Sequence, residues 1–423
     1  LAVGLVGLGD RRPERGPMRR RRMLGALATG AIGLSGCLGI SRRSPPESTP
    51  DRSPAPDDDT PSRENPEDAT PTTQFQYDAR NSGVADGDAP DAADLRWRTT
   101  LDPIDGGLSV ADERVVAAAG GNLIALDADS GDVRWDVGVG HSIEAPPALT
   151  ADTAYVACWN GGPRRDRGVA AIDLVDGSER WRAIADVDVT SAPTLAGGSV
   201  YVGGSLHSSE VVAIDAVEGE ERWRFEAGRY ATTPAVADGA VYVGGGESPV
   251  AYALDARDGS ALWRTEVDDR VWGAPTVVED TVYVGSRSGR VYALASDDGY
   301  ERWSVPVGDD VRASVAATDN GVFVAAKGSI ASLDPDGDER WSVETKGFAF
   351  APTVVGDSVV LADTTAAVCL DASGGSERWR REARERQISD MVFAGVRSPP
   401  VVADGVAYVA SHGGDVYALS DGS

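Results

Sequence analysis

An eleven-residue pattern recurs along the chain and constrains the fold more than any other feature. Its clearest instance, Ala253–Trp263, reads ALDARDGSALW: the end of one strand, a tight Asp-Gly turn, and a second strand that ends on Trp. Related stretches occur at 125–135, 171–181, 213–223, 293–303 and 369–379. A repeat of roughly forty residues with one hairpin and one Trp per unit is typical of a β-propeller.

Each full unit contains four strand signals. In the unit after Trp263, the runs 263–267, 274–278, 281–285 and 290–294 are rich in β-branched and aromatic residues and are bounded by Gly, Asp and Pro. The last unit ends before its Trp strand, whereas the strand at Trp97 has no preceding turn, so we expect this strand to complete the C-terminal sheet. The sequence thus predicts an all-β, eight-bladed propeller of four-stranded antiparallel blades over 75–423, closed by the Trp97 strand; seven blades would leave one Trp unexplained.

The composition limits the partners. The formal net charge is -27, from 67 Asp+Glu against 40 Lys+Arg, and Lys327 and Lys346 are the only lysines. Such a surface repels nucleic acid and anionic lipid, so neither is an expected partner. High acidity with little Lys resembles proteins of salt-loving archaea, and a moderately acidic mesophilic protein is the alternative. The three cysteines and three histidines are scattered, so no disulfide and no metal site are predicted.

The N-terminal region resembles a targeting signal. Residues 1–17 are interpreted as a start-site overreach before Met18. Residues 18–37 resemble a twin-arginine (Tat) lipoprotein signal, with Arg20 and Arg21 in a basic run, an apolar stretch too short to span a bilayer, and a lipobox-like end at Cys37, the expected lipidation site. An ordinary signal peptide with an incidental cysteine is the alternative.

A tether follows the signal. Residues 38–74 are acidic and rich in Pro, Ser and Thr, and they have too little apolar surface to fold, so we expect a disordered tether. The aromatic stretch Phe75–Gly83 is expected to pack on the main domain. The sequence therefore predicts an exported protein, lipid-anchored on the outer face of the cell membrane and in contact with the membrane through that anchor only.

The pattern A-x-D-x-x-x-G-x-x-x-W resembles the tryptophan-docking motif of PQQ-like (quinoprotein-type) repeat propellers, over about residues 75–423. The resemblance implies that each Trp packs on a Gly turn and clamps adjacent blades, which gives a structural role to Trp97, Trp135, Trp181, Trp223, Trp263, Trp303, Trp341, Trp379, Gly131, Gly177, Gly219, Gly259, Gly299, Gly337 and Gly375. Some instances depart from the motif: Ala295 replaces Asp, Cys369 replaces Ala, and the one ending at Trp341 is a residue short.

That family includes quinoprotein alcohol dehydrogenases, BamB-type outer-membrane assembly lipoproteins and exported archaeal lipoproteins, and this chain resembles the last group most. In the dehydrogenases the resemblance implies PQQ, Ca²⁺, an Asp base and often a disulfide between adjacent cysteines. This chain has no adjacent cysteines, nearly minimal repeats and no position that matches the catalytic Asp. No cofactor, metal or catalytic residue is therefore expected.

Two sets of residues are candidates for binding. Aligning the units on the Pro that opens each inner strand places a variable residue three positions earlier, and these residues are predicted to ring the mouth of the central channel: Asp105, Glu144, Thr190, Ala231, Trp272, Arg312, Ala349 and Arg397. A weakly constrained, solvated rim is the alternative. Trp272 is the strongest candidate because it lies outside the docking motif.

The second set lies in the insertion Cys158–Gly168, where Trp159, Arg164, Arg165 and Arg167 form a candidate docking loop for an acidic partner or an anion. A long hairpin with solvated charges is the alternative. The function predicted from the sequence is a binding or scaffold module for a protein partner at the membrane surface. A quinoprotein dehydrogenase-like enzyme and an extracytoplasmic small-solute sensor are the alternatives.

Overall fold

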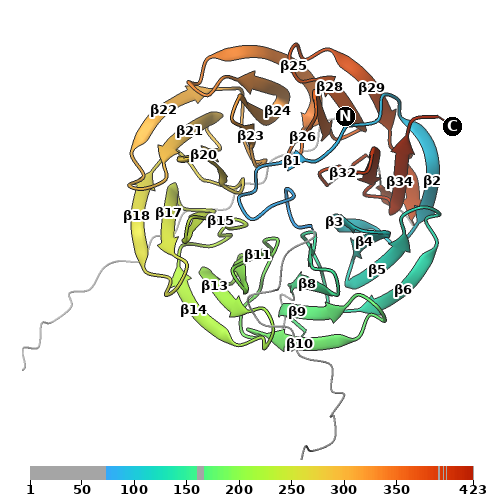
Figure 1. The fold of residues 1–423 in the computed structure, drawn as a ribbon, viewed down its shortest axis with the longest axis horizontal. Coiled ribbons are helices and arrows are strands. Elements are labelled where there is room, and N and C mark those ends of the chain that lie inside the picture. Colours follow the sequence, from blue (N-terminus) through green and yellow to red (C-terminus); the bar gives the residue numbers. More distant parts are fainter. Residues whose placement is uncertain (1–72, 160–165, 389–390, 394, 397, 423) are drawn as a thin grey trace, which may run out of the picture. The chain divides into compact units, whose positions relative to one another are not determined.

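The computed structural model describes residues 73–159, 166–388, 391–393, 395–396 and 398–422. These residues form eight blade sheets arranged in a ring, and one further two-stranded sheet (Figure 1). The predicted all-β, eight-bladed propeller is confirmed. The expected overreach, the signal with Arg20, Arg21 and Cys37, and nearly all of the tether lie outside the described residues. No helix within the described residues is long and apolar enough to cross a membrane.

Blades are numbered in chain order, and the strands of each blade are given from the innermost to the outermost. Blade 1 contains β3 (Ile104–Ala111), β4 (Arg114–Ala119), β5 (Asn122–Asp127) and β6 (Val133–Gly138). Blade 2 contains β7 (Ala148–Leu149), β8 (Thr153–Cys158), β9 (Gly168–Asp173) and β10 (Glu179–Ala183). Blade 3 contains β11 (Thr194–Ala196), β12 (Ser199–Gly203), β13 (Glu210–Asp215) and β14 (Glu221–Glu226). Blade 4 contains β15 (Ala235–Ala237), β16 (Ala240–Gly244), β17 (Val250–Asp255) and β18 (Ala261–Glu266).

The second half of the ring has two irregular blades. Blade 5 contains β19 (Thr276–Val278), β20 (Thr281–Gly285), β21 (Arg290–Ala295) and β22 (Glu301–Pro306). Blade 6 has three strands, because a single long strand takes the place of the two middle ones: β23 (Ala316–Thr318), β24 (Gly321–Leu333) and β25 (Glu339–Phe348). Blade 7 contains β26 (Thr353–Val355), β27 (Ser358–Ala362), β28 (Ala366–Asp371) and β29 (Glu377–Glu382), with β1 (Val84–Ala85) added at its inner edge.

Blade 8 closes the ring with strands from both ends of the described chain. It contains β32 (Val401–Ala403), β33 (Val406–Ala410), β34 (Asp415–Ser420) and β2 (Asp94–Thr100), and a small hairpin of β30 (Arg386–Ile388) and β31 (Met391–Phe393) precedes it. Trp97 on β2 lies opposite Ala418 on β34, the same register that Trp263 has with Ala253 inside one hairpin. The strand at Trp97 therefore supplies the outer edge of the last blade, as predicted.

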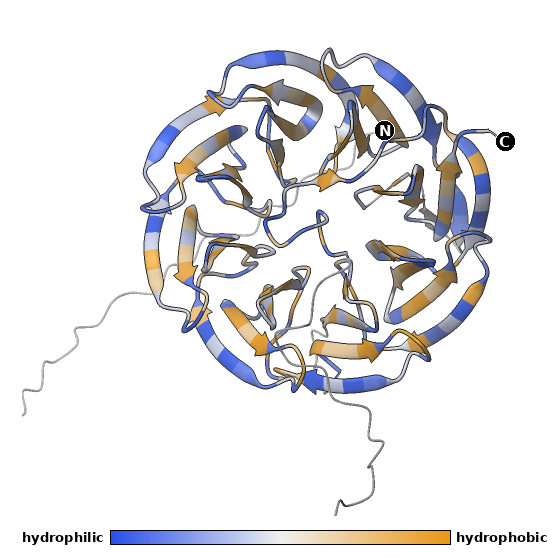
Figure 2. Cartoon of the chain, viewed as in Figure 1, coloured by the Kyte–Doolittle hydropathy of each residue, from blue (hydrophilic) through white to orange (hydrophobic). Residues whose placement is uncertain are grey.

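The apolar core lies between neighbouring blades. One cluster joins Trp97, Val416 and Ala418 of blade 8 to Val115 and Leu126 of blade 1, so the seam is packed like any other blade contact. The inner and middle strands are mostly buried, whereas the outermost strands alternate between exposed and buried residues. Figure 2 shows the same division, with hydrophilic residues gathered along the outermost strands. Burial on both faces explains why each sheet requires its neighbours.

The repeated motif forms the contact between blades. The indole N–H of Trp263 donates to the carbonyl oxygen of Ser296 at 2.9 Å in the next blade. The Trp263 ring lies so close to Gly299 that a Cβ there would come within 2.7 Å of it. Equivalent indole bonds reach the next blade's turn from six further tryptophans: Trp97, Trp135, Trp181, Trp223, Trp303 and Trp341.

The N-terminal segment 73–85, here called the hub segment, crosses the centre of the ring of blades (Figure 1). Seven of the eight blades donate an inner-strand amide to it. Five of these amides donate to backbone carbonyl oxygens of the hub segment: Leu149 to Thr73, Val236 to Ala79, Val277 to Arg80, Ala317 to Ser82 and Val354 to Gly83. The other two donate to side chains: Leu195 to the Gln74 Oε1 and Val402 to the Tyr77 hydroxyl.

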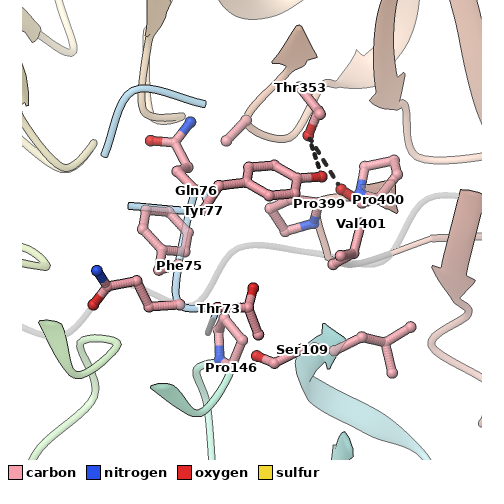
Figure 3. A pocket seen from close by; sticks show the side chains of 14 residues that line it. Thr73, Phe75, Gln76, Tyr77, Ser109, Pro146, Thr353, Pro399, Pro400 and Val401 are labelled. Atoms are coloured by element: carbon pink, nitrogen blue, oxygen red, sulfur yellow. Dashed lines mark hydrogen bonds between the residues drawn. The ribbon is translucent and has the colours of Figure 1, made fainter. Parts of the chain in front are cut away.

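An inner sheet edge is a row of unpaired backbone groups, and the hub segment satisfies part of that row in each of these blades. Tyr77 shows the arrangement in detail (Figure 3): its hydroxyl donates to the Thr353 Oγ1, which in turn donates to the carbonyl oxygen of Pro400. Burial raises the pKa of Tyr77 to about 12. The expected packing of Phe75–Gly83 on the domain is therefore a set of backbone and side-chain hydrogen bonds at the axis of the ring.

Candidate site at the channel mouth

The mouth of the channel contains two adjoining hollows. The larger, of about 960 Å³, is lined by Asp105, Glu144, Trp272, Arg312 and Ala349 together with residues deeper in the channel. The smaller, of about 660 Å³, is lined by Thr190 and Ala231 and shares Trp272 and Arg312 with the first. Seven residues of the sequence-predicted ring thus line one continuous site, and the eighth, Arg397, lies outside the described residues.

The hub segment forms the floor of the larger hollow. Phe75 lines this hollow, as do Phe350 and Pro399 from the inner ends of blades 7 and 8. Phe75 also borders the small cavity on the inner side of the hub segment, which Figure 3 shows from close by. The mouth is therefore a blind cup with an apolar floor and a polar wall.

Trp272 is the centre of the wall on the side of blades 5 and 6. The guanidinium carbon of Arg287 lies 4.4 Å from the centre of its ring, and that of Arg312 lies 5.0 Å from it. Arg312 also lies 4.6 Å from the ring centre of Phe348, so it is in contact with two aromatic residues. Such cation–π contacts hold a guanidinium in place while leaving its edge free to bond.

Asp310 joins the two arginines. Its carboxylate lies 2.6 Å from the Arg312 Nη2 and 3.1 Å from the Arg287 Nε. Burial of this carboxylate opposes ionisation, but the hydrogen bonds from Arg312 and Arg287 outweigh burial and lower the pKa of Asp310. One carboxylate is thus shared by two guanidinium groups, which leaves a positive charge on this side of the mouth. The Trp272 Nε1 is buried and has no hydrogen-bond partner among the described residues.

The opposite side of the mouth is acidic. Asp105 of blade 1 lies 3.2 Å from the His412 Nδ1 of blade 8. Burial raises the pKa of the neighbouring Glu144 carboxyl, and the negative charge of Asp105 raises it further. The mouth therefore has an acidic pole at Asp105 and Glu144 and a cationic, aromatic pole at Arg312 and Trp272.

Sequence reasoning missed a second set of residues at the mouth. Arg287, Lys327, Thr364 and His412 each follow a ring position by fifteen residues, in the turn between the second and third strands of a blade or its equivalent in β24. Arg287 contacts Trp272, Lys327 lies 5.7 Å from the Phe348 ring centre, and Thr364 lines the larger hollow. The same alignment, read at this turn, would have identified them.

The candidate docking loop is only partly described. Arg164 and Arg165 lie outside the described residues. Arg167 does not extend freely, because its Nη1 lies 3.6 Å from the buried Asp188 carboxylate and its Nε donates to the Ala185 carbonyl oxygen at 2.7 Å. Trp159 is half-buried and makes backbone hydrogen bonds with Ser142. The described part of this loop is therefore engaged in local structure.

A quinone with its metal would need particular groups in the mouth. Among the described residues, no cluster of three or more His, Cys, Asp or Glu side chains could hold a metal ion. Cys158 and Cys369 are buried free thiols in different blades rather than a disulfide over the mouth. The Trp272 ring, one of the aromatic side chains of the wall, is already in contact with two arginines. The described residues do not fit this cofactor, and we assign no chemistry to it.

The chain is thus a closed β-propeller whose blades are joined by docked tryptophans. A blind hollow at one end of its axis has an acidic side and a cationic side. A family model described as outer membrane protein assembly factor BamB matches residues 81–224, 207–325 and 326–423. The chain belongs to that family.

Solved structures of three kinds resemble the chain. BamB from Moraxella catarrhalis is 18% identical with a TM-score of 0.64, over 78% of this chain and 97% of that one. A quinohemoprotein alcohol dehydrogenase from Comamonas testosteroni is 15% identical with a TM-score of 0.67, over 82% and 80%. The computationally designed Ika8 protein is 14% identical with a TM-score of 0.66, over 79% and 100%. At these identities the likeness establishes the fold alone.

One curated relative matches a short part of the chain. XoxF of Paracoccus denitrificans, which is named as a dehydrogenase, is 37% identical over 91 residues. The match covers 20% of this chain and 15% of the relative's length. It is therefore a likeness between a few repeats, and the relative's activity is not transferred.

Proposed function

We propose that this protein is a binding module that receives a segment of a partner protein in the mouth of its central channel. The observation that carries the proposal is the blind cup: the hub segment closes the floor, and the residues that vary from blade to blade line the wall. Variation among repeats is where a symmetric ring gains specificity. The family description names an assembly factor, which also supports a role in binding other proteins.

The two hollows suit an extended segment better than a small solute. They adjoin at Trp272 and Arg312, and together they run from blade 3 across the axis to blades 1 and 7. Their walls offer charged, hydroxyl and aromatic groups, which is the mixture that protein interfaces use. A solute of metabolite size would contact only part of this surface.

Photo-crosslinking in intact cells tests the proposal. A benzoylphenylalanine placed at Thr190 or Ala349, in the mouth, is expected to capture a discrete protein. The same group at Leu262, which is 53% exposed on an outer strand, is the matched control and should not. The mouth crosslink should be lost when Trp272→Ala is added. Absence of any mouth-specific crosslink, or a stoichiometric quinone absorption in the purified protein, would contradict the proposal.

We also propose that the module is exported and anchored by a lipid on Cys37. The basis is the signal-like sequence around Arg20 and Arg21, the lipobox-like end at Cys37, and the Pro-, Ser- and Thr-rich stretch that follows. Cys37→Ser is expected to move the protein from the membrane fraction to the soluble extracytoplasmic fraction. Retention of the variant in the membrane fraction would contradict a lipid anchor at this residue.

A further inference from the structure

Several contacts fix the position of Arg312 in the mouth. It lies beside the Trp272 and Phe348 rings, and its Nε and Nη2 both bond to the Asp310 carboxylate. Its side chain is 38% exposed and lines both hollows. A guanidinium has five N–H donors in a rigid plane. With one edge bonded to Asp310, the remaining donors are those that can meet a ligand.

The neighbourhood provides a net positive charge for such a ligand. Arg287 bonds to Asp310 as well, so two guanidinium groups share one carboxylate. Because the guanidinium plane of Arg312 is already fixed, less side-chain entropy is lost when a ligand binds. A carboxylate is the planar anion that a guanidinium edge matches with two parallel hydrogen bonds.

The whole mouth excludes a strongly anionic ligand. Its charged lining residues are three acids and two arginines: Asp105, Glu144, Glu247, Arg270 and Arg312. The acids at Asp105 and Glu144 lie in the same hollow as Arg312 and would repel a polyanion. They would instead attract a cation. The charge division therefore matches a segment that carries an acidic and a basic side chain some distance apart.

We propose that the mouth recognises a peptide segment of mixed charge, with an Asp or Glu carboxylate on the free edge of Arg312 and a Lys or Arg side chain at the Asp105 and Glu144 pole. This inference rests on the proposed function and specifies its ligand. Trp272 and Phe348 hold Arg312 in place through their rings.

The experiment uses random seven-residue peptides displayed on phage and selected on the purified full chain. Enriched peptides are expected to combine an acidic with a basic residue. The consensus peptide is then synthesised, and its affinity is measured by calorimetry for the unaltered protein, Arg312→Glu and Arg312→Lys. Arg264→Glu is the control, because Arg264 is 57% exposed on an outer strand and lies 3.1 Å from Glu266.

Arg312→Glu is expected to weaken binding at least about tenfold, as the loss of a charge-assisted pair predicts. The affinity of Arg312→Lys for the peptide should lie between those of Arg312→Glu and the unaltered protein, and Arg264→Glu should bind the peptide as tightly as the unaltered protein. Exchanging the acid of the peptide for Lys should restore binding to Arg312→Glu. Thermal unfolding of each variant confirms that it is folded, and Arg312→Lys keeps the test valid if Arg312→Glu does not fold.

Three results would overturn the inference: enriched peptides without an acidic residue, equal affinity of Arg312→Glu and the unaltered protein, or full displacement of the peptide by an equal concentration of free glutarate. The first two leave the proposed function standing if the peptides still depend on Trp272. Selection of no peptide at all would overturn both the inference and the proposed function.

Discussion

Trp379 donates its indole N–H to the carbonyl oxygen of Pro90 at 2.7 Å. The other seven docking tryptophans reach the turn of the following blade, but in blade 8 that turn is replaced by two separate chain segments, β34 and β2. Residues just before β2 therefore take over the docking contact. The same N-terminal region thus supplies the hub segment, the acceptor for Trp379 and the outer strand of blade 8.

Because β2 is held to β34 without a connecting turn, the seam should open more readily than a hairpin. Amide hydrogen exchange is expected to be faster for Arg98–Thr100 than for the corresponding residues of β18, Arg264–Glu266, which follow a covalent turn. Equal protection of the two strands would show that the seam is as strong as an ordinary blade.

The contact between the docking Trp and the Gly turn predicts that adding a single methyl group to the Gly lowers the free energy of unfolding substantially. Gly259 has φ +72°, and a Cβ would come within 2.6 Å of the Trp223 ring; Gly239 has φ +79° and open space around it. Gly239→Ala should cost about 1 kcal/mol from backbone strain alone. Gly259→Ala should cost about 2–4 kcal/mol, because collision adds to strain. Denaturant unfolding measures both, and equal losses would contradict the clamp.

The hub segment should contribute to stability through single polar atoms. The amide of Leu195 donates to the buried Gln74 Oε1 at 2.7 Å, so Gln74→Ala leaves this amide without its partner. We expect a loss of about 1–3 kcal/mol in the free energy of unfolding. Asn320→Ala, at an exposed turn, is the control and should change it by less than about 0.5 kcal/mol. A Gln74→Ala protein as stable as the control would contradict a stabilising role for this contact.

Several features of the fold could be predicted from the sequence. The spacing of the tryptophans predicts the number of blades, and the unpaired strand at Trp97 predicts how the ring closes. The position before each inner strand predicts the ring that contains Trp272, because period-two alternation fixes which residues share an orientation. These features are repetitive, and repetition is what a sequence displays most clearly.

Other features could not be predicted, for physical reasons. Part of the bonding between the hub segment and the blades is through its backbone, which leaves almost no trace in residue type. Its side-chain bonds come from Gln74, Gln76, Tyr77 and Asn81, which follow no repeat pattern. The partnership of Trp272 with Arg287 and Asp310 joins three separate loops across two blades. The pairing of Arg167 with Asp188 turns a candidate docking residue inward, and the hairpin of β30 and β31 lacks the repeat pattern altogether.

The acidic pole predicts a pH dependence of stability. Folding raises the pKa of Glu144, so the folded protein favours the protonated carboxyl. The contribution of Glu144 to stability is complete at a pH below its pKa in the unfolded chain, and it is lost as the pH rises through its pKa in the folded protein. Glu144→Gln should therefore raise the melting temperature relative to the unaltered protein at pH 7, and the gain should vanish near pH 4. Glu218→Gln, at an exposed turn, is measured in parallel as the control. A gain that persisted at pH 4 would contradict the assignment.

We propose that binding takes place at the variable mouth and that the repeated motif is structural; fluorine NMR of the 5-fluorotryptophan-labelled protein distinguishes the two roles directly. The chain has 10 tryptophans: the eight docking residues, Trp159 and Trp272. Trp272→Phe and Trp159→Phe assign the two signals of interest. On addition of the selected peptide, we predict a shift of the Trp272 signal with the docking signals unchanged. A shift of Trp159 or of the docking signals with Trp272 unmoved would place the binding surface elsewhere and contradict the account.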